Sequence, residues 1–331
     1  MGIQPCQLRG LSFHRNPTSL ARLSNLASAH KSLSNRMDVD LFHSAGCCIR
    51  VGRELDLEAL FMKLKTVATK NATFNVLDEG KGLPILFVHG FPLDHSMWRF
   101  QLEPFAKSNR VICPDLPGFG KSTFNANTDN PISMRSFADS LADLLNAIEV
   151  DQPIVLCGLS MGGYVGWQFW KHHHERLAAL VACNTRAASD TEQVGRARKI
   201  SAESVRETGA ASVADAMIPK VFFQTEKEIA HQTHSVISKT DPESIATGQI
   251  AMSLRPDATP WLSDIEIPCL FVAGQHDEIT TPTEMRENSE LVPNSTFVEI
   301  AGAGHMSPLE CPGEFNQTLN AFLKYNEKIH T

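Results

Sequence analysis

PIVLCGLSMGG, residues 153–163, is the stretch of this 331-residue chain that decides its fold. The apolar residues 153–157 predict a buried strand, and the apolar pattern of residues 164–170 predicts a helix directly after it. Between them, Gly158 and Gly162 flank Ser160 in a G-x-S-x-G pattern. Glycines here remove side chains that would collide across a tight strand-to-helix turn, and the turn presents the serine hydroxyl at the positive end of the helix. The pattern predicts Ser160 as a nucleophile, or else as the unreactive serine of a tight loop.

Strand-like and helix-like segments alternate on both sides of this turn. Residues 84–88 form a continuous apolar run, which is typical of a strand covered by helices on both faces. Residues 131–148 carry apolar side chains at helical spacing. This alternation predicts an α/β fold with a mostly parallel, doubly wound sheet. Two short strands are expected within residues 65–78, further strands at 110–113, 177–181, 269–273 and 296–300, and helices opening at Pro282 and Pro312.

Two segments depart from this alternation. Residues 187–262 contain no strong strand and are helical in composition, so we predict a small helical cap between two parts of an α/β core, residues 62–186 and 263–331. Residues 1–36 contain five Lys or Arg residues and no Asp or Glu, which resembles an organelle transit peptide. The alternatives are an unstructured tail or a true start at Met62. In each case, the fold is expected to exclude the N-terminal extension, residues 1–61.

Composition narrows the classes of partner. A hydrophobic content of 42% and a charged content of 20% are ordinary for a globular protein, and a net charge of −7 favours neither nucleic acid nor an acidic membrane as a partner. The eight cysteines form no C-x-x-C pair, which indicates a reducing compartment rather than disulfides or a metal site. We expect a cytoplasmic protein, or an organellar one if the transit-peptide interpretation holds. A homo-oligomer is left open.

Two residues downstream of Ser160 complete a candidate catalytic set. A serine hydroxyl needs a base to become a good nucleophile, and the base needs a carboxylate to orient it. Asp277 follows the predicted strand 269–273, and His305 follows 296–300 in a glycine-rich loop. The order Ser, Asp, His is the one that accompanies this kind of turn. We predict that Ser160 attacks a carbonyl carbon, that His305 takes its proton, and that Asp277 orients His305.

Neighbouring residues are alternatives for the acid. Glu278 is adjacent to Asp277 and is the second candidate. Asn184 and Asp190 lie after the predicted strand 177–181 and form a further alternative site. Both alternatives keep the carboxyl or amide group at the end of a strand, where the fold places its ligands.

Backbone groups are expected to bind the negative charge that develops on the attacked carbonyl oxygen. The N–H of Met161 directly follows the nucleophile, and the N–H of Phe91 lies in the loop after residues 84–88, so the two predict an oxyanion hole. Arg186 follows the predicted strand 177–181 and is a candidate for binding a substrate carboxylate, with a surface or packing role as its alternative.

Five motifs, taken together, give a resemblance to a known family. They are His-Gly-Phe-Pro at 89, Asp-Leu-Pro-Gly-Phe-Gly-Lys-Ser at 115, Gly-Leu-Ser-Met-Gly-Gly at 158, Gly-Gln-His-Asp at 274 and Gly-Ala-Gly-His-Met at 302. With them, residues 62–328 resemble the α/β-hydrolase superfamily. The motif at 158, Ala-Cys-Asn-Thr at 182 and the small helical cap followed by Ile267-Pro268 resemble its 3-oxoadipate enol-lactonase and cofactor-free peroxidase/esterase branch. The serine at position 160 departs from haloalkane dehalogenases and epoxide hydrolases, which have Asp there.

The resemblance implies a serine hydrolase that cleaves a small-molecule carboxylic ester or lactone through an acyl-enzyme. Such a triad needs no metal and no cofactor, and the chain has neither a Walker loop nor a G-x-G-x-x-G after a strand. Three alternatives remain open: a cofactor-free perhydrolase or haloperoxidase, a C–C bond hydrolase, and a non-enzymatic ligand receptor with the same fold. Side chains of the cap are expected to choose the substrate.

Overall fold

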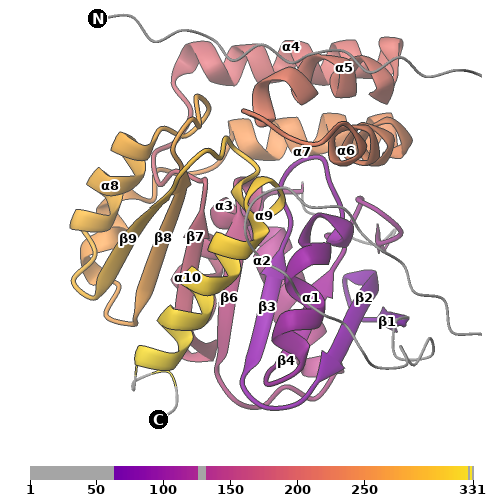
Figure 1. Ribbon diagram of the computed structural model, residues 1–331. Coiled ribbons are helices and arrows are strands. Elements are labelled where there is room, and N and C mark those ends of the chain that lie inside the picture. The colour runs from indigo at the N-terminus through magenta and orange to yellow at the C-terminus, as the bar shows by residue number, and fades with distance from the viewer. Residues whose placement is uncertain (1–62, 126–131, 327–328, 330–331) are drawn as a thin grey trace, which may run out of the picture. The chain divides into compact units, whose positions relative to one another are not determined.

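The computed structural model describes residues 63–125, 132–326 and 329. The predicted extension, residues 1–61, lies outside the described residues. The described strands form one sheet in the order β1-β2-β4-β3-β6-β7-β8-β9, with β5 paired to β2 (Figure 1). Strands β3, β4 and β6 to β9 run parallel, and β1, β2 and β5 pair antiparallel. The predicted mostly parallel α/β sheet is therefore confirmed.

The strands fall close to their predicted positions. β3 coincides with the apolar run at 84–88, and β6 leads directly into the G-x-S-x-G turn. All residues of β3, β6 and β8 are buried, as continuous apolar runs predict for central strands. The bounds are β1 Leu64–Ala68, β2 Ala72–Gly80, β3 Pro84–Val88, β4 Arg110–Pro114, β5 Thr123–Phe124, β6 Ile154–Leu159, β7 Leu177–Cys183, β8 Cys269–Gly274 and β9 Ser295–Ile300.

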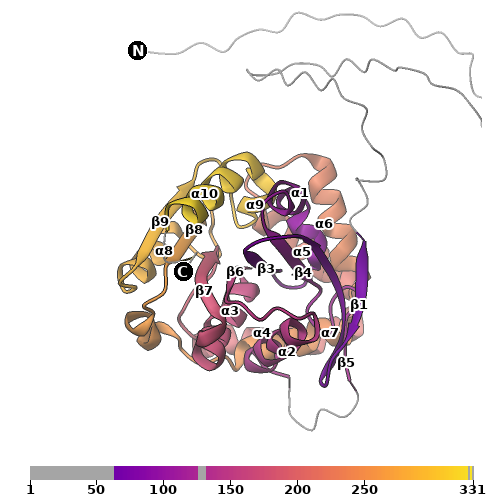
Figure 2. The same ribbon diagram turned by 90° about the horizontal axis from the view of Figure 1, so that it is seen from below.

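Helices cover both faces of this sheet (Figure 2). Leu156 of β6 packs in one apolar cluster with α2, α3 and α8, whereas its neighbours Val155 and Cys157 pack in a second cluster with α1 and α10. This alternation follows from the pleat of a strand, in which successive side chains point to opposite faces. The bounds are α1 Arg99–Ala106, α2 Met134–Ala147, α3 Met161–His173, α8 Pro282–Glu290, α9 Ser307–Glu310 and α10 Pro312–Tyr325, with 3-10 turns at His95–Trp98, His174–Arg176 and Thr259–Asp264.

The segment between β7 and β8 contains four further helices, which lie over one end of the sheet (Figure 1). They are α4 Glu192–Thr208, α5 Ala210–Val221, α6 Lys227–Lys239 and α7 Pro242–Ser253. Thr191 and Asp241 cap α4 and α7 by accepting hydrogen bonds from backbone N–H groups of the first turn. Gly209, with a φ of 79°, allows the sharp turn between α4 and α5. This arrangement supports the division that we propose, with residues 187–262 as a cap on an α/β core.

The helical segment after β3 has no counterpart among the predictions. The 3-10 turn at residues 95–98 and α1 follow β3. Pro104 lies inside α1, and polar residues alternate with its apolar ones, which hides the helical period in the sequence. Within the described part of the chain, no helix combines the length and the apolar character that crossing a membrane requires.

Candidate active site

Ser160 occupies a strained turn between β6 and α3. Its φ of 53° and ψ of −113° lie in a region that residues other than glycine rarely adopt. The neighbouring glycines are required by close contacts. A Cβ on Gly158 would lie 2.4 Å from the carbonyl oxygen of Gly162, and a Cβ on Gly162 would lie 2.3 Å from that of Val88. The local geometry expected from the G-x-S-x-G pattern is therefore present.

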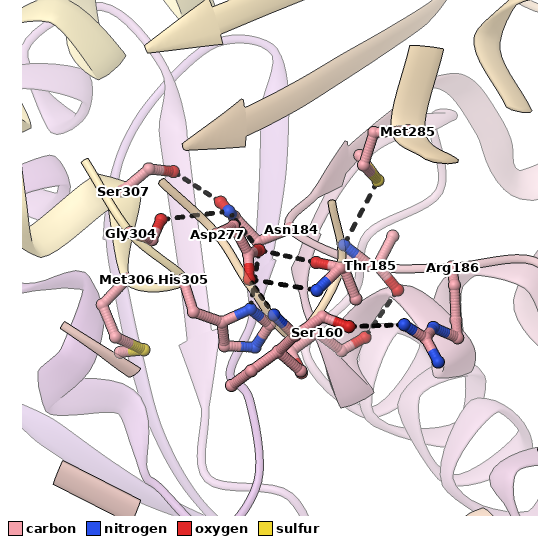
Figure 3. A network of polar contacts seen from close by, with 12 residues as sticks. Ser160, Asn184, Thr185, Arg186, Asp277, Met285, Gly304, His305, Met306 and Ser307 are labelled. Carbon is pink, nitrogen blue, oxygen red and sulfur yellow. Dashed lines mark hydrogen bonds and ion pairs between the residues drawn. The ribbon is translucent and has the colours of Figure 1, made fainter. Parts of the chain in front are cut away.

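His305 and Asp277 meet beyond the carboxyl ends of β9 and β8 (Figure 3). His305 Nδ1 lies 2.8 Å from Asp277 Oδ2, and the two side chains are only 5% and 0% exposed. The loops that hold them touch: a Cβ on Gly274 would lie 1.9 Å from the carbonyl oxygen of Gly304. Glycine at 274 therefore permits the approach that pairs the two side chains.

The carboxylate of Asp277 is held in its ionised form. Oδ2 accepts hydrogen bonds from His305 Nδ1, from Thr280 Oγ1 at 2.6 Å and from Asn184 Nδ2 at 2.9 Å, and Oδ1 accepts from the backbone N–H groups of Ile279 and Thr280. Burial by itself would raise the pKa of this carboxyl, but the charge of His305 and these hydrogen bonds lower it to about 2. An ionised Asp277 keeps the imidazole proton on Nδ1, so that Nε2 can accept another proton.

Three residues around this pair were not predicted as its support. Asn184 had been considered as part of an alternative acid site, but in the structure its amide donates to Asp277 and to the carbonyl oxygen of Gly304. Ser307 donates to Asn184 Oδ1 at 2.6 Å, and Thr280 donates to Asp277. Their positions directly after β7 and beside the two predicted residues were the available signal, since such positions gather at one edge of a parallel sheet.

Ser160 and His305 line one cavity of about 110 Å³ beneath the cap. Its walls come from the loops after β3, β6 and β9 and from all four helices of the cap. Most of the side chains are apolar, which keeps water away from the two polar groups. The lining residues are Phe91, Leu93, Leu159, Ser160, Tyr164, Arg198, Met217, Val221, Thr233, Ile237, Met252, Ile279, His305 and Met306.

The two backbone groups predicted to form an oxyanion hole are both at this site. Met161 opens α3, and Phe91 lines the cavity. Among the described residues, none accepts a hydrogen bond from the N–H of either. Gly90 brings the Phe91 loop against the nucleophile, because a Cβ on Gly90 would lie 3.5 Å from Ser160 Cβ. The buried His89 holds this loop by donating from Nδ1 to the carbonyl oxygen of Gly90 and accepting at Nε2 from the N–H of Leu116.

The other candidate residues lie elsewhere. Glu278 is exposed, and Asp190 forms ion pairs with two arginines of the cap. Arg186 donates to the carbonyl oxygen of Ile279 and forms an ion pair with Glu284 at 3.1 Å, and it is not among the residues that line the cavity. The guanidinium of Arg186, a candidate for binding a substrate carboxylate, is thus engaged by protein groups outside the cavity.

One group in the described part of the chain has the ligand types and spacing for a metal ion. The ligand atoms of Asp94, His95 and Asp115 lie within 4.8 Å of one another. Asp115 already accepts hydrogen bonds from the backbone N–H groups of His95 and Lys121 and from His95 Nδ1. These bonds tie the loop after β4 to the loop after β3, so we interpret the group as a structural brace.

Comparison with known proteins places this geometry in a family. The chain is 29% identical to 3-oxoadipate enol-lactonase 2 of Acinetobacter baylyi over 78% of its own length and 94% of the relative's. A malate-bound thermophilic esterase from Thermogutta terrifontis is 37% identical, with a TM-score of 0.76 over 81% of this chain and all of that one. The enol-lactonase from Burkholderia xenovorans LB400 is 26% identical, with a TM-score of 0.72 over 78% of this chain and all of that one.

The family comparison agrees with these likenesses and with the observed sheet and its inserted helices. Residues 85–318 match the alpha/beta hydrolase family, a range that begins in β3 and ends in α10. The match covers the turn at Ser160 and the loops of Asp277 and His305. The chain therefore belongs to the alpha/beta hydrolase family.

Proposed function

We propose that this protein is a serine hydrolase that cleaves a small carboxylic ester or lactone through an acyl-enzyme. The observation that carries the proposal is the pairing of His305 with an ionised Asp277 at one wall of the cavity that Ser160 also lines. This set provides a nucleophile, a base and an orienting carboxylate in one apolar pocket. The likeness to two enol-lactonases and to an esterase favours ester and lactone bonds.

In the proposed reaction, Ser160 Oγ attacks the carbonyl carbon while its proton passes to His305 Nε2. The N–H groups of Phe91 and Met161 donate to the oxygen that becomes negative. The tetrahedral intermediate then collapses, and the proton on His305 passes to the departing alkoxide. In a lactone, this alcohol stays attached to the acyl chain.

A water molecule completes the cycle. His305 Nε2 takes one of its protons, and the hydroxide attacks the carbonyl carbon of the acyl-serine. The ester bond to Ser160 breaks, the proton returns to Oγ, and the carboxylic acid leaves. Throughout, Asp277 stabilises the imidazolium form of His305 and keeps its ring in one orientation.

The test is hydrolysis of 4-nitrophenyl acetate by the wild type and by Ser160→Ala. We expect Ser160→Ala to lower kcat by about 10³-fold or more with an unchanged thermal transition. Ser212→Ala, which alters an exposed serine of the cap, is the control and should retain wild-type activity. Equal activity of Ser160→Ala and the wild type would reject the assignment. A wild type that releases no more than one equivalent of product would instead favour a ligand receptor.

A further inference from the structure

Two cavities lie on either side of a wall near the proposed nucleophile. The inner cavity is the one of about 110 Å³ that Ser160 and His305 line. The outer cavity, of about 330 Å³, lies between helix α6 of the cap and the core segment 93–99. Leu93 and Thr233 line both cavities. The side chains of these two residues therefore form the wall between the inner and the outer cavity.

Helix α6 supplies one half of this wall. Thr233 and Ile237, one helical turn apart, line the inner cavity, whereas Gln232 and Val236, also one turn apart, line the outer one. Thr233 is only 5% exposed, and its hydroxyl donates to the carbonyl oxygen of Ile229 at 2.8 Å. The hydroxyl proton is thus used within the helix, and Thr233 serves the wall by its bulk.

Leu93 supplies the other half, from the loop that also contains Phe91. It is 5% exposed, and its backbone N–H donates to the carbonyl oxygen of Gly90 at 3.0 Å, which closes a tight turn. Thr240, directly after α6, donates from Oγ1 to the carbonyl oxygen of Pro92 at 3.2 Å. This hydrogen bond ties the end of α6 to the residue before Leu93, so the two halves of the wall are held together.

The two cavities differ in the size of ligand that they admit. The inner cavity is below the roughly 300–1,000 Å³ of typical ligand pockets, whereas the outer one falls within that range. Leu93, Met97 and Val236 give the outer cavity an apolar surface against which a hydrocarbon chain can pack. The wall therefore separates the reacting groups from a space that suits an alkyl chain.

We propose that Leu93 is a specificity-determining residue which, together with Thr233, limits the substrate to esters with short chains by closing the catalytic cavity toward the outer one. The inference deepens the proposed ester hydrolysis and rests on it. Removal of the Leu93 side chain joins the two cavities, and an alkyl chain then extends from the reacting carbonyl group into the outer cavity. Each methylene of that chain moves from water to an apolar surface, which raises kcat/KM for longer esters.

The test uses three uncharged esters: ethyl acetate, ethyl hexanoate with a longer acyl chain, and hexyl acetate with a longer alcohol chain. Hydrolysis of each releases one proton, which a pH-stat measures. The quantity of interest is the ratio of kcat/KM for each longer ester to kcat/KM for ethyl acetate. We expect Leu93→Ala to raise this ratio about 10- to 100-fold for at least one of the longer esters. Leu93→Val should give a smaller rise, and it carries the same test if Leu93→Ala does not fold.

Two further variants separate the wall from a general enlargement of the site. Ile237→Ala is the matched control, because it removes a side chain of similar volume that lines only the inner cavity. It should raise the ratios much less than Leu93→Ala does. Val236→Trp places a bulky ring in the outer cavity, so adding it to Leu93→Ala should return the ratios toward the wild-type values.

Unchanged ratios for both longer esters in Leu93→Ala and Leu93→Val would overturn the inference. An equal rise in Ile237→Ala would do the same, as would a rise in Leu93→Ala that Val236→Trp leaves in place. Each of these results leaves the hydrolase proposal standing, since hydrolysis of ethyl acetate would have been observed. A wild type that hydrolyses none of the three esters would instead count against the hydrolase proposal itself.

Discussion

The carboxylate of Glu310 accepts a hydrogen bond from the backbone N–H of Gly304, the residue directly before His305, at 2.9 Å. The same oxygen accepts from the N–H of Met306, directly after His305, at 3.2 Å. The other oxygen accepts at 2.8 Å from the N–H of Phe223, where the cap chain leaves α5. One side chain therefore ties both backbone neighbours of the proposed base to the cap.

Glu310→Ala is expected to lower kcat/KM for 4-nitrophenyl acetate about 10-fold and to lower the free energy of unfolding by about 1–3 kcal/mol, because three backbone N–H groups lose their acceptor. Kinetics and urea denaturation measure the two effects. Glu310→Gln should recover part of both, since its amide oxygen still accepts. Glu314→Ala, which removes an exposed acid of α10, is the control for the change in charge. Unchanged kcat/KM in Glu310→Ala would refute the positioning role.

The ionised carboxyl of Asp277 is expected to contribute stability that disappears in acid. Its pKa in the folded protein is about 2, below the usual value near 3.8, so the unfolded chain binds more protons between these values. Stability then rises with pH across this window. The contribution, about 2 kcal/mol for a shift of this size, is complete above about pH 4 and is lost as the pH falls through about 2.

Urea denaturation of the wild type and Asp277→Asn between pH 2 and pH 6 measures this contribution. The difference between their free energies of unfolding should narrow as the pH falls toward 2. Asp151→Asn, at an exposed position, should differ from the wild type by a small amount that does not change with pH. A difference for Asp277→Asn that is the same at all these pH values would count against the ionised buried carboxyl.

Most of the core sheet could be predicted because its strands are continuous apolar runs. Every residue of β3 and β8 is buried. In a chain where strands and helices alternate, a continuous apolar run such as residues 84–88 indicates a strand that helices cover on both faces. The support of Asp277 by Asn184 could not be predicted, because Asn184 reaches it across 93 residues of sequence. Only the order of strands in the sheet brings β7 beside β8 and so places Asn184 there.

The charged residue of the cavity was harder still to identify. Arg186 was a candidate for binding a substrate carboxylate because it follows a strand, with a surface or packing role as the alternative. The structure pairs Arg186 with Glu284 and instead places Arg198, one of several arginines on α4, in the cavity wall. The choice among these arginines depends on how α4 packs against α7, since Gln249, 51 residues away, holds Arg198. No local pattern encodes such a contact.

Thr280 offers a test of how Asp277 is held. Its hydroxyl donates to Asp277 Oδ2 at 2.6 Å and is fully buried. Thr280→Val keeps the shape but removes this donor, so the pKa of Asp277 should rise and the protein should lose about 1 kcal/mol of stability. The pH profile of the free energy of unfolding, measured by urea denaturation, should therefore shift upward at its acid end. Thr281→Val is the control: it removes the N-cap of α8 at a similar cost in stability but should leave the profile in place.

Gly162 tests whether the turn at Ser160 needs glycine for lack of space. A Cβ there would lie 2.3 Å from the carbonyl oxygen of Val88 and 2.9 Å from that of His89, which are backbone atoms of β3 and of the loop after it. Gly162→Ala must therefore push α3 away from β3, and we expect it to destabilise the protein by about 3 kcal/mol or more, or to prevent folding.

Gly313→Ala is the matched control, since no atom lies within 4 Å of a Cβ on this residue near the start of α10. It should leave stability unchanged or raise it by about 0.5–1 kcal/mol, because alanine loses less backbone entropy in a helix. Thermal melts of the two variants give the comparison, and a Gly162→Ala protein as stable as Gly313→Ala would show that the turn can accept a side chain.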